Sequence, residues 1–250
     1  WPGFLSRPLW LMLGMLANLM VDCGSYLPVG LFVSLAEVGI YSFAFTLIVQ
    51  LAMLLSSNVQ LVLTPALARL NDEPARQRDA IAKALRALML IASPACLGFA
   101  VIAEPLERVL WQGKWAAAIP AVQAFGVFYP MRITFGLTIA VLQAKGMFKR
   151  WAILTGIEGS AMIAAAAVAA ALWGSPGAIA LCAGSAMALA RFAITWHTLG
   201  LCGVPSQERA GALVPAWALA LLAGAVVFAA DTLTVHSGLW ARLAASMSAL

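Results

Sequence analysis

Four charged residues stand inside long apolar stretches of this 250-residue chain: Asp22, Arg132, Glu158 and Arg191. A charge at the centre of a membrane-spanning helix costs about 2.5 to 3.5 kcal/mol on insertion scales, so it must pair or face water. The fork of an arginine can bond two phosphate oxygens at once, which makes Arg132 and Arg191 candidates for binding an anionic group. The alternative is that Glu158 pairs with Arg191 or Arg132 and only fixes the packing of the helices.

The amides near these positions extend the candidate site. Asn18 and Asp22 are four residues apart, which places them on one face of a helix. The predicted substrate-binding residues are Arg132, Arg191, Asn18 and Gln123. Asp22 and Glu158 are predicted either to bind a coupling ion or to pair with the arginines.

Helix geometry gives these charges a rough depth. At 1.5 Å per residue from the nearest predicted cytoplasmic boundary, Glu158 lies about 10 Å deep and Arg191 about 13 Å deep. The same count places Arg132 at about 17 Å and Asp22 at about 21 Å. These depths allow one polar cluster in the middle and the cytoplasmic half of a helix bundle.

The sequence predicts no metal site, no cofactor and no enzymatic chemistry. The two histidines, His197 and His236, are far apart, and the four cysteines form no CxxC pair. No glycine-rich phosphate loop and no nucleophile elbow is present. Nothing in the chain indicates binding to nucleic acid.

The composition indicates which kind of fold must hold these residues. Hydrophobic residues make up 63% of the chain and charged residues 10%, whereas soluble domains carry about 25% charged residues. This excludes a soluble globular enzyme, and the apolar stretches are far longer than the roughly ten-residue strands of a membrane barrel. The prediction is an all-α, polytopic bundle of transmembrane helices.

The apolar stretches predict seven full spans and part of an eighth. Residues 151–190 would form a helix of about 60 Å, twice the hydrocarbon thickness, so a break is expected at Trp173–Gly177. Polar segments such as 69–86 and 104–114 are predicted loops. The chain starts at Trp1, and its last stretch, 239–250, is shorter than the about 20 residues needed to span; we therefore expect a piece of a longer protein. The predicted spans are 8–36, 39–68, 87–103, 115–144, 151–173, 177–201, 210–230 and the incomplete 239–250.

Lysine and arginine residues predict the orientation of the bundle. With the N-terminus in the cytoplasm, ten of them fall in inside loops and two, Arg108 and Lys114, in outside loops. An excess of basic residues on the cytoplasmic side is the rule for such proteins. The ten inside residues are Arg7, Arg69, Arg76, Arg78, Lys83, Arg86, Lys145, Lys149, Arg150 and Arg209.

Two motifs carry a family resemblance. The first runs from Val38-Gly-Ile-Tyr-Ser-Phe-Ala-Phe45 through Leu63-Thr-Pro-Ala-Leu-Ala-Arg-Leu70 to Asn71-Asp-Glu-Pro-Ala-Arg76, and the second is Gly113-Lys-Trp-Ala-Ala-Ala-Ile-Pro-Ala-Val-Gln123. In order and spacing they resemble the bacterial polysaccharide (O-antigen type) flippases of the multidrug/oligosaccharidyl-lipid/polysaccharide exporter superfamily, over about residues 18–201. We interpret the motif residues as structural: Gly39 for close helix approach, Pro65 to end a span and Trp115 as an interface anchor.

The resemblance implies one lobe of a two-lobe transporter. Residues 1–201 would be the second transmembrane lobe, 202–250 extra C-terminal helices, and the N-terminal lobe would lie outside this chain. The implied function is flipping of undecaprenyl-pyrophosphate-linked oligosaccharides across the bacterial inner membrane. The implied partners are the bilayer, the lipid-linked substrate, the missing lobe and polysaccharide polymerase or assembly proteins. A drug or metabolite antiporter of the same superfamily, or a non-catalytic membrane assembly subunit, remains an alternative.

Overall fold

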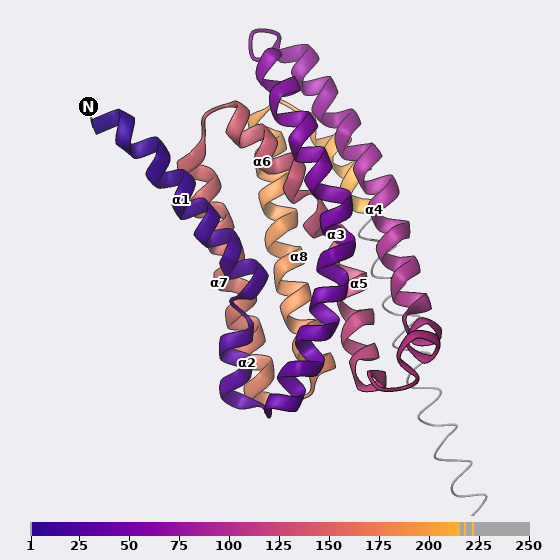
Figure 1. The fold of residues 1–250 in the computed structure, drawn as a ribbon. Helices are drawn as coiled ribbons and strands as arrows, with labels where there is room; N and C mark the ends of the chain where they lie inside the picture. Colours follow the sequence, from indigo (N-terminus) through magenta and orange to yellow (C-terminus); the bar gives the residue numbers. More distant parts are fainter. Residues whose placement is uncertain (1, 216–217, 219–221, 223–250) are drawn as a thin grey trace, which may run out of the picture.

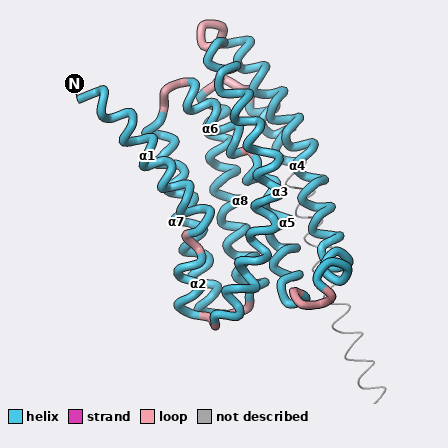
Figure 2. Tube along the Cα trace, in the orientation of Figure 1, coloured by secondary structure: helices cyan, strands magenta, loops and turns pink. Residues whose placement is uncertain are grey.

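The fold, seen in a computed structural model, is described for residues 2–215, 218 and 222. Every element in this part of the chain is a helix (Figure 2), which confirms the all-α prediction. The elements are α1 (Pro2–Cys23), α2 (Tyr26–Phe32), α3 (Leu35–Arg69), α4 (Pro74–Trp111), the short 3-10 helix η1 (Ala116–Ala118), α5 (Ile119–Ile133), α6 (Phe135–Ala144), α7 (Phe148–Leu172) and α8 (Pro176–Leu201).

Six segments of the described chain are long and apolar enough to cross a membrane, and they correspond to the first six predicted spans. Helices α1 and α2 share the first segment, and η1, α5 and α6 share the fourth. The predicted break at Trp173–Gly177 is the turn between α7 and α8. Residues 206–215 are helical, but most of the predicted seventh span and all of the eighth lie outside the described residues.

The helices extend further than the apolar stretches that predicted them. The polar segments 69–86 and 104–114 were expected to be loops, yet α3 continues to Arg69 and α4 spans 38 residues from Pro74 to Trp111. Alanine, arginine, lysine and leucine are good helix formers, so charge alone does not end a helix once it leaves the apolar region. Pro65, which was expected to end its span, lies inside α3.

The most buried span, Ala116–Ala144, forms the centre of the bundle. Helix α5 packs against α8, α4 and α3, while α1 lies at the edge and packs mainly on α7 (Figure 1). Aromatic rings fill the space between α3 and α5, with Phe45 and Phe125 in an edge-to-face contact at 5.1 Å between centroids. Because α5 is central, a polar side chain on it meets several helices at once.

The central span is broken at Thr134, between α5 and α6. The Thr134 hydroxyl donates to the carbonyl of Met131 at 2.7 Å and shares a 2.8 Å hydrogen bond with Thr195 of α8. The break is therefore tied both to its own helix and to a neighbour. It places Arg132 in the last turn of α5, and Phe135 begins α6.

The turns alternate between the two ends of the bundle. The turns after α3, α6 and α8 lie at the same end as the N-terminus in Figure 1, and those after α2, α4 and α7 lie at the opposite end. At the first end the buried amide of Gln77 donates to the carbonyl of Leu67 and to the side chain of Asn71, both at 2.9 Å. Asn71 in turn donates to the carbonyl of Ala144 at 3.1 Å. This relay joins the α3–α4 turn to the end of α6.

One motif residue, Gly39, has different surroundings from those expected. Among the described residues, a Cβ added at Gly39 would meet nothing within 4 Å, so this glycine does not serve a close helix approach there. Trp115 stacks on Phe43, with ring centroids 4.1 Å apart and planes 7° apart, and so joins the α4–α5 connection to α3.

The close approach of α4 and α5 occurs at Gly126 instead. A Cβ there would lie 2.7 Å from the Cβ of Ala100 and 3.1 Å from the carbonyl oxygen of Cys96. We expect Gly126→Ala to lower the unfolding free energy by about 1 to 3 kcal/mol, the usual cost of overpacking. Thermal unfolding of the purified protein in detergent would measure it. Gly98→Ala, which has open space around the new methyl group, is the matched control; an equal loss in both variants would contradict this interpretation.

Candidate functional site

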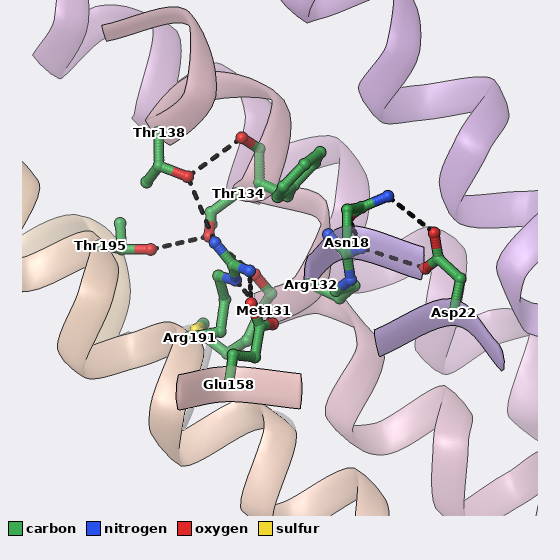
Figure 3. Close-up of polar contacts among 10 residues, drawn as sticks. Asn18, Asp22, Met131, Arg132, Thr134, Thr138, Glu158, Arg191 and Thr195 are labelled. Carbon is green, nitrogen blue, oxygen red and sulfur yellow. Dashed lines mark hydrogen bonds and ion pairs between the residues drawn. The ribbon is translucent and has the colours of Figure 1, made fainter. Parts of the chain in front are cut away.

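The four intramembrane charges lie close together as two ion pairs (Figure 3). Arg132 of α5 pairs with Asp22 of α1, with 3.1 Å between Nη2 and Oδ1. Arg191 of α8 pairs with Glu158 of α7. The four residues thus come from four different helices, and each pair joins two helices.

The first pair is extended by Asn18. Arg132 Nη2 also donates to Asn18 Oδ1 at 2.9 Å, and Asn18 Nδ2 donates to Asp22 Oδ2 at 2.8 Å. The predicted helix face of Asn18 and Asp22 therefore presents both side chains to one guanidinium. Three side chains on two helices form a closed triangle of polar contacts.

This triangle lines a cavity of about 170 Å³ at the level of the membrane spans. A water molecule needs only about 10 to 15 Å³ measured in this way, so the cavity has room for several waters or a small polar group. The lining residues come from α1, α3, α5 and the start of α6: Asn18, Asp22, Val49, Ala52, Met53, Gln60, Tyr129, Arg132 and Phe135.

Arg132 retains unused hydrogen-bonding capacity in this cavity. A guanidinium carries five N–H donors, and within the described residues only Nη2 donates a hydrogen bond. Nε is buried without a partner. Only 7% of the residue is exposed, so little of the guanidinium meets bulk water. The arrangement is suited to an acceptor that enters the cavity, such as an anionic oxygen.

The second pair is sealed. Arg191 is 1% exposed and Glu158 0%, and the guanidinium contacts both carboxylate oxygens, with Nε donating to Oε1 at 2.9 Å. Nη1 of Arg191 donates to the hydroxyl of Thr138 at 3.4 Å. Neither charged residue lines the cavity. The sequence left Arg191 and Arg132 as possible partners of Glu158, and in the structure the partner is Arg191.

The candidate residues thus separate into three groups. Asn18, Asp22 and Arg132 lie together in the cavity wall, and Arg191 and Glu158 pair behind it. Gln123 is half-buried on α5 and does not line the cavity; it precedes Arg132 by nine residues, or roughly 13 Å of helix. The binding and coupling roles of all six remain predictions.

Six of the nine lining residues were not among the predicted site residues, and three of these six are polar or aromatic: Gln60, Tyr129 and Phe135. Gln60 carried a signal, since it is an amide in an otherwise uncharged apolar stretch. The two aromatic residues carried none, because an aromatic side chain inside an apolar span is ordinary core material. Among the described residues, no three His, Cys, Asp or Glu side chains gather in a way that could hold a metal ion.

Comparison with known proteins gives a match to a protein family and a match to a curated protein. Residues 4–120 match a family described as polysaccharide biosynthesis protein. A Klebsiella pneumoniae protein named "uncharacterized membrane protein in cps region" is 30% identical over 108 residues, which are 43% of this chain and 22% of that protein. The chain therefore spans a minor part of this curated relative. No solved structure matches the chain.

The matched segment contains the first sequence motif and most of the second. It covers α1 to η1 and so includes Asn18 and Asp22, while Arg132, Glu158 and Arg191 lie beyond it. Residues 4–120 thus match the polysaccharide biosynthesis protein family, and part of the chain is similar to a membrane protein of a cps region.

Proposed function

We propose that the protein containing this chain moves lipid-linked oligosaccharides across the bacterial inner membrane for surface polysaccharide biosynthesis. The single observation that carries the proposal is Arg132, a buried guanidinium with unused donors in a cavity at membrane depth. The family match supports the biosynthetic context, and the chemistry of the cavity supports an anionic group on the cargo.

A pyrophosphate is the group that this cavity is best suited to receive. Arginine forms bidentate, charge-assisted hydrogen bonds to phosphate oxygens, and these are stronger in a site with little water. The cavity is smaller than the 300 to 1,000 Å³ typical of sites that enclose a whole drug-sized ligand. We therefore propose that it anchors only the pyrophosphate, and that the sugars lie between this lobe and an N-terminal lobe outside the chain.

The proposed orientation follows from the basic residues. The basic residues that the sequence assigned to inside loops lie on segments at the end of the bundle that carries the N-terminus. Arg108 and Lys114 lie near and in the α4–η1 turn, at the opposite end. We propose that the first end faces the cytoplasm. The cargo would enter the cavity from that side and leave toward the periplasm as the two lobes rock about it.

Two other functions each have one observation in their favour. Asp22 is the more exposed member of the cavity pair, at 21% of its side chain against 8% for Arg132, and a carboxylate in the wall would suit an antiporter of organic cations. The sealed Arg191–Glu158 pair would suit a non-transporting assembly subunit. The unused donors of Arg132 favour an anionic cargo over both.

Reconstitution tests the proposal. The full-length protein would be placed in vesicles with a fluorescent undecaprenyl-pyrophosphate-linked sugar, and the fraction in each leaflet would be followed with a membrane-impermeant quencher. We expect movement between leaflets that requires the protein and is competed by unlabelled lipid-linked pyrophosphate. Movement of an organic cation but not of the lipid would support the antiporter, and movement of neither would support the assembly subunit.

A further inference from the structure

Two guanidinium groups lie against one aromatic ring at the α5–α6 break. The Cζ atom of Arg132 lies 4.3 Å from the centroid of the Phe135 ring, and that of Arg191 lies 5.2 Å from the same centroid. Cations within about 6 Å of a ring centroid are attracted by the ring quadrupole. Phe135 is therefore in contact with the open pair and with the sealed pair.

The position of the Phe135 ring is fixed by contacts on the side of the Arg191–Glu158 pair. The carbonyl of Phe135 accepts a hydrogen bond from the Thr138 hydroxyl at 3.0 Å, and that same hydroxyl oxygen accepts one from Arg191 Nη1. The preceding residue, Thr134, is tied to Thr195 of α8. Phe135 thus starts α6 with its carbonyl bonded by the Thr138 hydroxyl and its ring in contact with a buried cation.

The orientation of Arg132, in contrast, depends on few contacts. Its hydrogen bonds in the described chain all leave from Nη2 toward Asn18 and Asp22 on α1. These bonds hold the Nη2 end of the group, and within the described residues no hydrogen bond holds Nε or Nη1. The Phe135 ring, whose centroid lies 4.3 Å from Cζ, supports the remainder of the guanidinium.

The charges also explain why two cations can lie against one ring. Two guanidinium groups beside the same phenylalanine would repel each other strongly in an interior with little water. Glu158 contacts both ends of the Arg191 fork and neutralises it. Arg191 can therefore support the ring without adding a net charge beside Arg132.

We propose that Phe135 is a positioning residue for Arg132, and that the Arg191–Glu158 pair holds Phe135 in place. In this arrangement Phe135 holds the Arg132 guanidinium in the cavity wall, where it can meet a pyrophosphate. The inference rests on the proposed function, because it assigns a role relative to the same cargo. It also gives Arg191 a role behind the site in place of direct contact with the substrate.

The test uses full-length protein in detergent and farnesyl pyrophosphate as the probe, with farnesol as the uncharged control. We expect Phe135→Leu to weaken binding of farnesyl pyrophosphate by about 5- to 30-fold, the range of a cation–π contact. Phe135→Trp, which keeps an aromatic face, should bind within about twofold of the parent protein. Phe128→Leu is the matched control, since Phe128 is a half-buried phenylalanine on α5 that packs against Gly184 and does not line the cavity.

A second comparison distinguishes a positioning role of Phe135 from a role in folding. In an Arg132→Ala background, Phe135→Leu should cause no further loss of affinity, because the group that it positions is gone. The inference is overturned if Phe135→Leu binds like the parent, if Phe135→Trp fails to restore binding, or if the losses of the two substitutions simply add. If Arg132→Ala itself leaves binding unchanged, the proposed function fails instead, so the two failures are distinguishable.

Discussion

Replacement of Arg132 by alanine is expected to abolish export of surface polysaccharide by the full-length protein while its amount in the membrane stays unchanged. The substitution removes the donors that the cavity offers to an anion. Truncating one partner of a buried, hydrogen-bonded charge pair costs about 2 to 5 kcal/mol of binding, or roughly 30-fold to more than 1,000-fold in affinity. Complementation of a deletion strain, with polymer measured at the cell surface, would show the loss.

Three further variants make the Arg132 experiment specific. Arg132→Lys keeps the charge but loses the planar fork, so we expect partial export. Asp22→Asn removes the competing carboxylate, so binding of the anionic probe should not weaken. Arg108→Ala alters an exposed arginine paired with Glu104 and should export normally. Normal export by Arg132→Ala at normal protein level would refute the role of the cavity.

Breaking the sealed pair is expected to have the largest effect on folding. Glu158→Leu leaves the Arg191 guanidinium buried without a counter-charge, and Arg191→Met does the same to the carboxylate. Removing one partner of a buried ion pair costs about 3 to 5 kcal/mol, a large part of the stability of a typical domain. We expect either single variant to show little folded protein by fluorescence-detected size-exclusion chromatography.

A double variant distinguishes the effect of an unpaired buried charge from the effect of lost packing. Replacing both partners with apolar residues removes the uncompensated charge, and such replacements are often neutral or stabilising. We expect Glu158→Leu with Arg191→Met to restore most of the folded protein, but not full affinity for the probe, because the support behind Phe135 would be missing. Single variants that melt like the parent would contradict the assignment of this pair as a structural lock.

Much of the bundle could be predicted from the sequence because its signal is local. Long uncharged stretches define spans wherever a polar residue is costly, so the six described spans were found in order. The helix ends were harder, since residues 74–86 and 104–111 are polar yet remain helical within α4. Hydropathy records where a helix meets lipid, and backbone hydrogen bonding decides where it ends.

The pairing of the four charged residues could be predicted from the sequence only in part. The estimated depths are closest for Glu158 with Arg191 and for Asp22 with Arg132, the partners found in the structure. Depth along a helix does not fix rotation about its axis, however. Whether Arg132 or Arg191 faced the cavity therefore depended on how α5, α7 and α8 pack, and the sequence left both arginines as candidates for binding.

The amide relay at the α3–α4 turn has a consequence for what the first sequence motif reports. Asn71 and Gln77 lie in or directly after the first motif, and their hydrogen bonds go to the carbonyls of Leu67 and Ala144. None of these residues lines the cavity around Arg132. We therefore infer that this motif records how neighbouring helical hairpins are joined and carries no information about what the cavity binds.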